Sequence, residues 1–552
     1  MNGAKRIYFS FFIKSITIIW FNARNKTRAI RSRGYNQAMN SDHLATTPIK
    51  VNEKVRLWVI SAALLALFIG AMDSLIMSAA MPTIIADLGG LDIYSWVYTA
   101  YFLARAVALP VFGKLADLFK TKILFVTSIG AFMISSLVAG ISPNMTVLIV
   151  ARVFQGIAAG GNFALVYVVL TDMSPPGKRA KTLSLASFIW GIASVLGPTI
   201  GGVIVTYFSW RWVFFINIPI CLFSITLLAV YLVEIRPKKN RVNLDMAGVA
   251  TLSFTIVGLL TLLMLGGRDF GWLSSVSIGL VIITLVSGFG FYLSEKRARE
   301  PILALKFFTI RGFSIGNLSV FFSSFAIFSL FAYAPLFIQG ALGRSPMQVG
   351  VAMLSLSLGW SLGSLLLGQV FYRLERKTAS IIGAIFLVIG SGLTLMFNHQ
   401  TSMTTCFWVF QLVGIGMGFV AISTLLVVQN ALDESDLGVA TSSNQFARSL
   451  GGTIGIGVSG VFVTAKIRTT MDALSLSGVI GALPANLVIQ LRENYERLFQ
   501  PGFQSQLLPQ VKMALQKTMG ENMRVVFWIV LAASLLCFIS CLFLPAGKRM
   551  RA

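Results

Sequence analysis

The sequence predicts an all-α protein that crosses a membrane many times. Of its 552 residues, 56% are hydrophobic and 12% are charged, and the mean hydropathy is +0.80. Fourteen apolar runs, each long enough to cross a hydrocarbon core of about 30 Å, follow one another along the chain. Lysines and arginines gather in short clusters between these runs. A soluble globule with a single membrane anchor would not show this combination.

The apolar runs are arranged as six, two and six. The first six predicted spans are residues 57–81, 95–116, 122–142, 146–170, 180–206 and 210–234. Two inserted spans, 244–265 and 274–294, separate the halves. The last six are residues 313–340, 346–370, 378–398, 403–430, 438–466 and 524–545. The sequence therefore predicts a bundle over 57–234, an inserted pair over 244–294 and a second bundle over 313–545.

The distribution of basic residues predicts which side of the membrane each loop faces. The loops after the even-numbered spans, with Lys114 included, hold 18 lysines and arginines, and the tail 546–552 adds 3. The short loops on the opposite side hold Arg211, Arg268 and Arg344. Because cytoplasmic loops are enriched in Lys and Arg, we expect both termini in the cytoplasm and the chain in the plasma (inner, cytoplasmic) membrane. This asymmetry explains the net charge of +25 without a nucleic-acid partner.

Two segments fall outside this plan. Residues 1–56 are basic, and their run YFSFFIKSITIIWF is too short to cross the membrane, so we expect a cytoplasmic tail or, alternatively, an initiator at Met39. Residues 467–523 are predicted to form a long extracytoplasmic loop. Two amphipathic stretches in it, LRENYERLF and LPQVKMALQKTM, flank Pro501 and Gly502. We expect a short helical hairpin over the outer mouth there, with a docking surface for a periplasmic adaptor protein as the alternative.

The residues that catalysis or metal binding would require are scarce. The four cysteines lie in apolar runs, with no other metal-binding residue types at ligand spacing beside them. The two histidines, His43 and His399, lie outside the spans. The sequence offers no paired carboxylates and no nucleophile beside a base. It therefore predicts no enzyme activity, no metal site and no cofactor.

The fifth predicted span is unusually rich in small residues. It contains GIASVLGPTIGG, with Gly191, Gly197, Pro198, Gly201 and Gly202. Four glycines and a proline would break a soluble helix, but neighbouring helices support such a backbone in a membrane. Small residues also let membrane helices approach closely.

Other motifs lie at related positions in the two halves. The connection after span 2 reads GKLADLFKTK, which includes Gly113, Asp117 and Lys122, and a partial copy, GQVFYRLERK, follows span 10. Span 4 carries ARVFQGIAAGG, with Arg152, Gln155 and Gly156. Span 1 carries AMDSLIMSAAMPTI around Asp73, and WRWVFFINIP opens span 6.

These motifs resemble those of the major facilitator superfamily, in its fourteen-helix drug/proton antiporter group (EmrB/QacA type). The resemblance runs from about residue 57 to 466. It implies the major facilitator fold, with 14 transmembrane helices as 6+2+6 and two pseudo-symmetric six-helix bundles. It also implies that the span 5 glycines form a proton-tight contact between the halves, and that Gly113, Asp117 and Lys122 belong to a loop that controls conformational switching.

Four ionisable residues lie well within the predicted spans: Asp73, Arg105, Arg152 and Arg448. A charge at the bilayer centre costs on the order of 3 kcal/mol, so each should face a cavity or a partner. Counted along the helices at about 1.5 Å per residue, Asp73 and Arg152 share a depth, with Arg105 about one turn deeper. Our hypothesis is that Asp73 binds the coupling proton and that Arg152, with Arg105, controls its ionisation.

The substrate-contacting residues are harder to predict. Phe325 and Phe328 lie among the phenylalanines of span 9, and we consider them together with Arg448 as candidates for a substrate cavity. Phenylalanines in a span can equally face lipid or pack between helices, and Arg448 can equally serve a structural role. Aromatic surfaces suit lipophilic, variable ligands. Amphipathic monocations, neutral compounds and lipophilic weak acids all remain open.

The sequence thus predicts a secondary active transporter that exports lipophilic or amphipathic small molecules, as in multidrug efflux and antibiotic resistance, in exchange for protons. A dedicated exporter of one endogenous metabolite, siderophore, antibiotic or lipid is the alternative. Protons, the substrates and the lipid bilayer are the expected partners, and the proton gradient takes the place of a cofactor.

Overall fold

The computed structural model describes residues 52–174, 179–234, 245–265, 271, 273–298, 305–367, 374–433, 437–476, 501–505 and 507–546. The regular elements in these ranges are helices. Thirteen of them are long and apolar enough to cross a membrane, and Met246–Leu259 adds a shorter apolar helical stretch. The expectation of an all-α polytopic membrane protein is confirmed.

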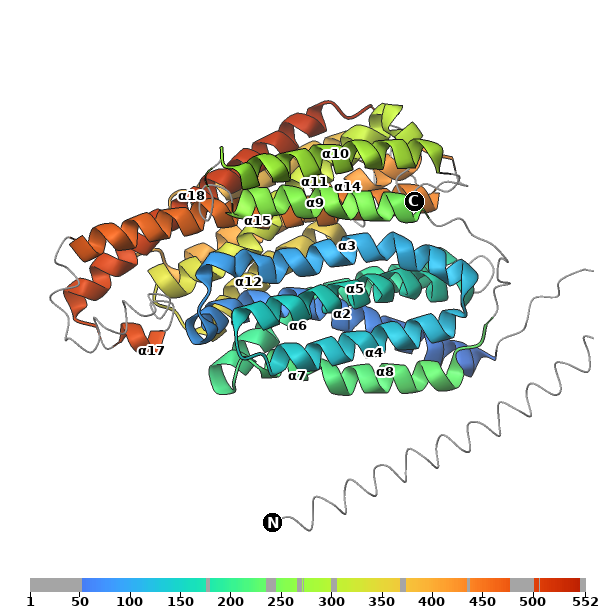
Figure 1. Ribbon diagram of the computed structural model, residues 1–552, viewed down its shortest axis with the longest axis horizontal. Coiled ribbons are helices and arrows are strands. Elements are labelled where there is room, and N and C mark those ends of the chain that lie inside the picture. Colours follow the sequence, from blue (N-terminus) through green and yellow to red (C-terminus); the bar gives the residue numbers. More distant parts are fainter. Residues whose placement is uncertain are drawn as a thin grey trace, which may run out of the picture.

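The first half of the chain forms a bundle of long, nearly parallel helices (Figure 1). Its elements are α2 (Glu53–Leu88), η1 (Leu91–Ile93), α3 (Tyr94–Leu118), α4 (Thr121–Gly140), α5 (Met145–Asp172), α6 (Arg179–Tyr207), α7 (Trp212–Phe215) and α8 (Asn217–Tyr231). Helix α2 packs against α6 and α8, α3 packs against α5, and α4 packs against both α5 and α8.

The second half forms a second bundle. Its elements are η2 (Leu305–Thr309), α11 (Arg311–Leu336), η3 (Phe337–Ala341), α12 (Pro346–Leu365), α13 (Arg376–Thr394), α14 (Met403–Asn430), α15 (Leu437–Leu476), α17 (Pro501–Gln504) and α18 (Pro509–Leu542). Helix α11 packs against α15 and α18, α12 packs against α14, and α13 packs against α14 and α18. Each of these pairings repeats one in the first bundle, as two pseudo-symmetric halves require.

The two bundles meet along matching helices. Helix α6 of the first half packs against α12 of the second, and α15 of the second packs against α3 of the first. Helix α2 also contacts α11 and α12. The interface between the halves is therefore built from α2, α3 and α6 on one side and α11, α12 and α15 on the other.

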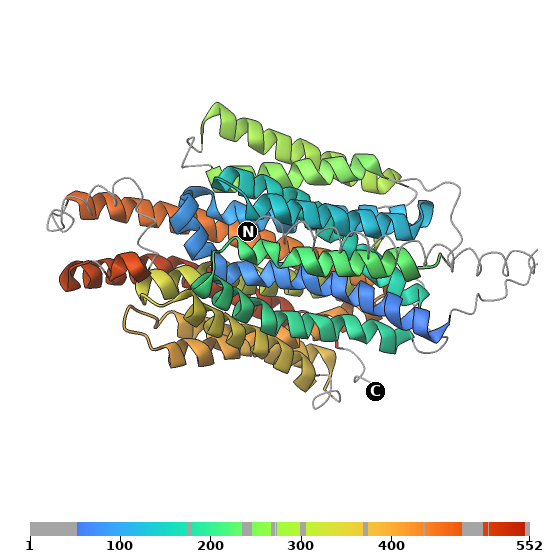
Figure 2. The same cartoon turned by 90° about the horizontal axis from the view of Figure 1, so that it is seen from below.

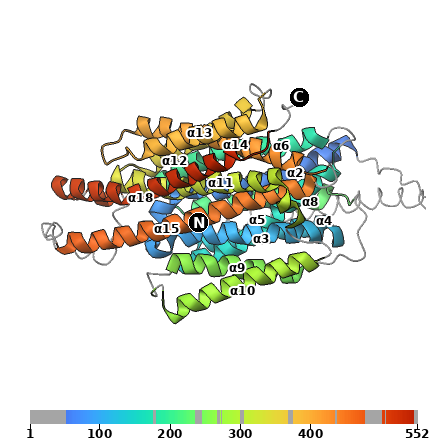
Figure 3. The same ribbon diagram turned by 90° about the horizontal axis from the view of Figure 1, so that it is seen from above.

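The two inserted helices, α9 (Met246–Leu265) and α10 (Ser275–Arg297), pack against each other at one edge of the bundle (Figure 3). Helix α9 also contacts both α3 and α15. Leu252 and Ile256 of α9 are buried in a cluster with Leu103 of α3. The inserted pair therefore covers the seam where the two halves meet.

Local sequence signals explain where several helices begin and end. Asn52, Asn144, Ser274 and Ser402 cap the amino ends of α2, α5, α10 and α14 with side-chain oxygens that accept backbone N–H bonds. Helix α2 ends at Gly89, where φ is +70°, a conformation that glycine adopts without steric cost. Helix α6 runs unbroken through Pro198, as we expect for a membrane helix supported by its neighbours.

The structure corrects two expectations about the connections. Most of the segment Gly113–Lys122, expected to include a loop over residues 117–121, is helical, because α3 continues to Leu118 and α4 begins at Thr121. The stretch LPQVKMALQKTM is not a separate hairpin helix, because it forms the first turns of α18. Helix α15 likewise continues to Leu476, and Figure 2 shows both helices extending past the bundle at one end. No proline lies inside these turns beyond Pro509 at the first position of α18, where proline is tolerated, so the helices outlast their apolar runs.

Some predicted features lie outside the described residues. They are the tail 1–51, the connection 235–244, the segment 368–373 with its partial motif copy, the stretch LRENYERLF and the end of the chain from 547.

Candidate functional site

Asp73 lies at the centre of a buried polar network inside the first bundle. Its carboxylate Oδ2 lies 2.6 Å from Nη1 of Arg152, and both side chains are fully buried. Its other oxygen accepts hydrogen bonds from Gln155 Nε2 at 3.0 Å and Asn217 Nδ2 at 3.1 Å. Three donors from α5 and α8 therefore hold one carboxylate of α2, which compensates for its removal from water.

A second layer of bonds fixes the donors themselves. Arg152 Nη1 also donates to Gln155 Oε1 at 2.8 Å. Gln155 and Asn217 both donate to Oγ of Ser136 in α4, at 2.7 and 3.1 Å. We call Asp73, Arg152, Gln155, Asn217 and Ser136 the Asp73 network. It joins α2, α4, α5 and α8, so a change of charge at Asp73 acts on four helices.

Arg152 also connects the network to α3. Its Nε donates to the Val97 carbonyl oxygen at 3.4 Å, and its guanidinium carbon lies 4.0 Å from the centre of the Tyr101 ring. Gly156 permits this approach, because a Cβ there would lie 2.4 Å from the Tyr101 carbonyl oxygen. The motif predicted in span 4 lies in α5 and has two functions in the fold. Arg152 and Gln155 bind Asp73, and Gly156 lets α3 approach closely.

Arg105 is near the Asp73 network without being a member of it. It lies in α3, buried, and its Nη1 is 3.4 Å from Oγ of Ser74. Its guanidinium carbon lies 4.7 Å from the ring centre of Phe102 and 5.0 Å from that of Phe163. The structure thus joins Asp73 to Arg152 directly, whereas Arg105 contacts aromatic rings.

The small residues of α6 serve two different contacts. Gly197 and Gly201 face α2 of the same half, where a Cβ on Gly201 would lie 2.8 Å from the Ile76 carbonyl oxygen. Gly202 faces α12 of the other half, where a Cβ would lie 3.0 Å from the Pro346 carbonyl oxygen. Gly191 has more room, because the nearest atom to its Cβ position is Ser361 Oγ at 3.8 Å.

Pro198 and a glycine of the second half complete this contact. A Cβ on Gly350 in α12 would lie 2.6 Å from the Pro198 carbonyl oxygen and 3.3 Å from the Gly202 Cα. Ser194 and Ser361 join their hydroxyls across the same seam at 3.2 Å. The motif residues therefore let the backbones of the two halves touch, as such small residues do in membranes.

The predicted switch segment lies at the turn between α3 and α4. Gly113 and Asp117 are in the last turns of α3, and Lys122 is in the first turn of α4. The Lys122 backbone N–H donates to Glu234 Oε1 at 2.8 Å. Glu234 follows α8, so its carboxylate satisfies a free backbone donor at the start of α4.

The candidate cavity residues lie along the interface between the halves. Phe328 of α11 is buried, with its ring centre 5.1 Å from that of Phe102 and 6.3 Å from that of Trp360. Arg448 of α15 places its guanidinium carbon 5.9 Å from the Trp360 ring centre. Phe325 is half-buried and packs at the edge of the same core. An aromatic surface therefore spans both halves.

The halves are also joined at the end of the bundle where α3 begins. The Tyr94 hydroxyl of α3 donates to the carbonyl oxygen of Ala332 in α11. The rings of Tyr94 and Tyr333 lie 5.4 Å apart, and the Tyr333 hydroxyl donates to the Ile456 carbonyl oxygen of α15 at 3.1 Å. Three helices from the two halves are thus connected by tyrosines at this end.

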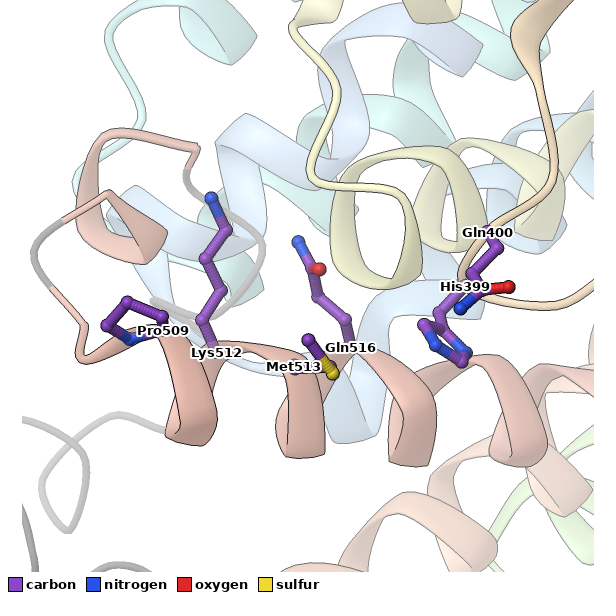
Figure 4. A pocket seen from close by; sticks show the side chains of 6 residues that line it. All are labelled: His399, Gln400, Pro509, Lys512, Met513 and Gln516. Atoms are coloured by element: carbon purple, nitrogen blue, oxygen red, sulfur yellow. The ribbon is translucent and has the colours of Figure 1, made fainter.

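A shallow pocket of about 320 Å³ lies elsewhere, where α18 extends past the bundle (Figure 4). Pro509, Lys512, Met513 and Gln516 of α18 line it together with His399 and Gln400, which precede α14. Gln516 donates to Gln504 Oε1 at 2.9 Å, which ties α18 to α17. The pocket is separate from the Asp73 network and from the interface between the halves.

Sequence reasoning did not identify Ser136 and Asn217 as members of the site. Neutral polar side chains are common in spans, and their rotation about the helix axis cannot be read from hydropathy. One signal was present: Asn217 is the single polar side chain in the apolar stretch VFFINIP, which opens span 6.

Comparison with known proteins agrees with this architecture. Residues 63–456 match the family model described as Major Facilitator Superfamily. The chain is 34% identical over 482 residues to the "Multidrug transporter protein MdtP" of Bacillus subtilis, covering 84% of this chain and 89% of that protein. It is 30% identical over 494 residues to "Multidrug resistance protein 3" of the same organism, with 89% and 95% covered.

Solved structures show the same fold at low sequence identity. A bacterial homologue of the human lysosomal transporter Spinster, in an inward-facing and unoccupied conformation, superposes with a TM-score of 0.62 at 14% identity, covering 90% of this chain and 98% of that one. The nucleoside transporter NupG superposes with a TM-score of 0.58 at 11% identity, covering 89% and 100%. By its family model, its relatives and its fold, this chain belongs to the major facilitator superfamily of membrane transporters.

Proposed function

We propose that the protein exports lipophilic or amphipathic small molecules in exchange for protons, by alternating access between its two halves. The relatives that match over most of the chain are named multidrug transporters and efflux pumps, which supports this substrate range. The observation that carries the proposal is the Asp73 network, because it places one carboxylate and its cation deep within the first bundle. No cofactor is needed, since the proton gradient drives the exchange.

In this proposal Asp73 is the proton carrier. Protonation would neutralise the carboxylate and weaken its bonds to Arg152, Gln155 and Asn217, since a neutral acid no longer accepts charge-assisted bonds. Arg152 would then be free to change its contacts with the Val97 carbonyl and the Tyr101 ring of α3. Because α3 bears Tyr94 and packs on α15, the proton at Asp73 would be coupled to the interface between the halves.

We also propose that the protein lies in the plasma (inner) membrane with both termini in the cytoplasm, because lysines and arginines are concentrated in the loops predicted on that side. The tyrosine contacts then lie at the extracytoplasmic end, and the α6–α12 contact runs from that end, at Gly202 and Pro346, toward the middle of the membrane, at Ser194 and Ser361. The described conformation is, in this proposal, closed toward the outside. The extensions of α15 and α18 would stand on the extracytoplasmic side, where a periplasmic adaptor protein would dock.

Replacement of Asp73 tests the proposal. In sealed proteoliposomes with an imposed pH gradient, Asp73→Asn should abolish proton-driven uptake of a fluorescent amphipathic substrate, because the amide cannot carry a proton. Asp87→Asn is the matched control, since Asp87 is about half exposed and pairs with Arg211 at the bundle end. It should keep transport within about twofold of the parent. Proton-driven transport that survives in Asp73→Asn would contradict the role of Asp73.

A further inference from the structure

A continuous cluster of aromatic rings connects two arginines across the interface between the halves. The arginine–aromatic cluster consists of Arg105 and Phe102 (α3), Phe163 (α5), Phe328 (α11), Trp360 (α12) and Arg448 (α15). From Arg105 the contacts run through Phe102 to Phe328 at 5.1 Å, then to Trp360 at 6.3 Å, and end at Arg448 at 5.9 Å. Both halves of the transporter therefore contribute one cation each.

Neither of these cations has a carboxylate partner among the described residues. The ion pairs described there are Arg152 with Asp73 and Arg211 with Asp87. The buried Nε of Arg448 has no hydrogen-bond partner among the described residues, and Nη1 of Arg105 donates a long hydrogen bond, 3.4 Å, to Oγ of Ser74. A cation without an ion-pair partner is costly inside a membrane, so a ligand that brings a negative charge would stabilise both arginines.

The aromatic rings alone cannot replace a negatively charged partner for the two arginines. A ring face attracts a guanidinium, but it accepts no directional bond from the five N–H donors of an arginine. An acid group on a ligand would accept such bonds, with charge assistance and often in pairs. The rings would meanwhile contact the apolar body of the same ligand. Arg448 and Trp360 are also only half-buried, so part of each side chain is accessible.

The alternative, a cationic substrate, would need an acid nearby. Asp73 does not provide one in this conformation, because both its oxygens already accept bonds from Arg152, Gln155 and Asn217 within the first bundle. A cation placed on the rings would instead be a third positive charge between Arg105 and Arg448. Repulsion between this cation and the two arginines is poorly screened away from water, so it would weaken binding.

We propose that the arginine–aromatic cluster is a binding site for amphipathic organic anions, with the acid group attracted by the charges of Arg448 and Arg105 and the apolar body held against the rings. This rests on the proposed transport function and narrows its substrate class from lipophilic compounds in general to those that carry one negative charge.

Three ligands with the same ring system test the preference for charge: 9-anthracenecarboxylate, 9-(aminomethyl)anthracene and 9-anthracenemethanol. Their fluorescence is titrated with the full chain, purified in detergent at neutral pH. The parent protein should bind the carboxylate at least about tenfold more tightly than the ammonium compound, a difference of about 1.4 kcal/mol. Equal or tighter binding of the ammonium compound would overturn the proposal. This comparison uses the parent protein alone, so it does not depend on whether a variant folds.

The variants locate the site. Arg448→Gln and Arg105→Gln should each raise the Kd of the carboxylate about tenfold, while the Kd of the neutral alcohol stays within about twofold. Arg448→Lys should retain part of the anion affinity, because it keeps the charge and loses the fork of donors. Arg211→Gln, which removes a partly exposed cation paired with Asp87, is the control and should leave the Kd values of all three ligands unchanged. Equal losses for carboxylate and alcohol in Arg448→Gln would contradict anion recognition.

Transport assays separate this proposal from the one on which it rests. If the parent carries the ammonium compound with proton counter-flow and ignores the carboxylate, the anion site is wrong and proton-coupled export stands. If the carboxylate binds through Arg448 and crosses the membrane without proton counter-flow, the anion site stands and the coupling proposal fails.

Discussion

At Asp73, three hydrogen-bond donors from two helices converge on one carboxylate that has no contact with solvent. This arrangement makes the charge of Asp73 and that of Arg152 dependent on each other. Removal of either partner alone leaves an uncompensated charge in a medium that solvates it poorly.

Arg152→Gln should therefore destabilise the protein by about 3–5 kcal/mol, the usual cost of breaking a buried ion pair from one side. Thermal unfolding of the detergent-purified variant, followed by fluorescence, would show this as a lowered Tm. The double variant Asp73→Asn/Arg152→Gln removes both charges and should recover most of the lost Tm. A double variant as unstable as Arg152→Gln alone would show that the pair is not the source of the effect.

The part of this site that the sequence predicts depends on helix regularity. Asp73 and Arg152 lie on long unbroken helices, so counting residues from the span ends gives their depth, and equal depth is what allows them to meet. Depth does not give rotation about the helix axis. For that reason Arg105, only about one turn deeper, could not be separated from the pair, and the neutral partners Ser136 and Asn217 were missed.

Helix α6 illustrates how one element serves two interfaces. Its small residues alternate between α2 in its own half and α12 in the other half. The sequence predicts a close contact from composition alone, but it does not say which glycine faces which helix. The complementary residue, Gly350, lies outside the motif and is revealed by the structure.

Gly350→Ala should impair transport, because the added Cβ would lie 2.6 Å from the Pro198 carbonyl oxygen, which is backbone and cannot rotate away. Overpacking of this kind costs about 1–3 kcal/mol, here against the state in which α6 and α12 touch. Transport rates in proteoliposomes at matched protein content measure the effect.

Gly191→Ala is the matched control on the same seam. Its Cβ would meet nothing nearer than Ser361 Oγ at 3.8 Å, so transport should stay close to the parent rate. Equal impairment by both substitutions would show that glycine at these positions serves helix flexibility rather than the contact between halves.

Helices α15 and α18 show where hydropathy misleads. Helix α15 continues past the end of its apolar run to Leu476, and α18 begins at Pro509, several turns before its apolar run. Hydropathy reports the depth of the hydrocarbon, whereas the length of a helix is set by caps and breakers. The sequence therefore predicts the spans well and the extensions poorly.

On the scale of the whole molecule, the two bundles repeat one set of helix pairings and meet along α6–α12 and α3–α15. The inserted α9 and α10 cover the second of these seams. Motion between the halves must therefore break and re-form the contacts at both seams. We call the contacts of Tyr94 and Tyr333, which join α3, α11 and α15 at one end of the bundle, the tyrosine latch.

Tyr94→Phe should weaken this latch, because it removes the hydrogen bond to the Ala332 carbonyl and keeps the ring. A buried hydrogen bond contributes about 0.5–1.5 kcal/mol, so the open population should rise about two- to tenfold. Spin labels at the adjacent ends of α3 and α11 would report longer distances. Tyr231→Phe, in a ring that stacks on Trp58 away from the seam, should leave those distances unchanged.

The most direct test of proton-coupled exchange is the reversal of substrate flux. Proteoliposomes hold a fixed substrate gradient while the pH difference across the membrane is varied and net substrate movement is recorded. Exchange with protons predicts that the point of zero flux shifts steadily with the imposed pH difference, so that a proton gradient drives substrate uphill. Zero flux that always falls at equal substrate concentrations, whatever the pH difference, would contradict coupling and identify a passive carrier.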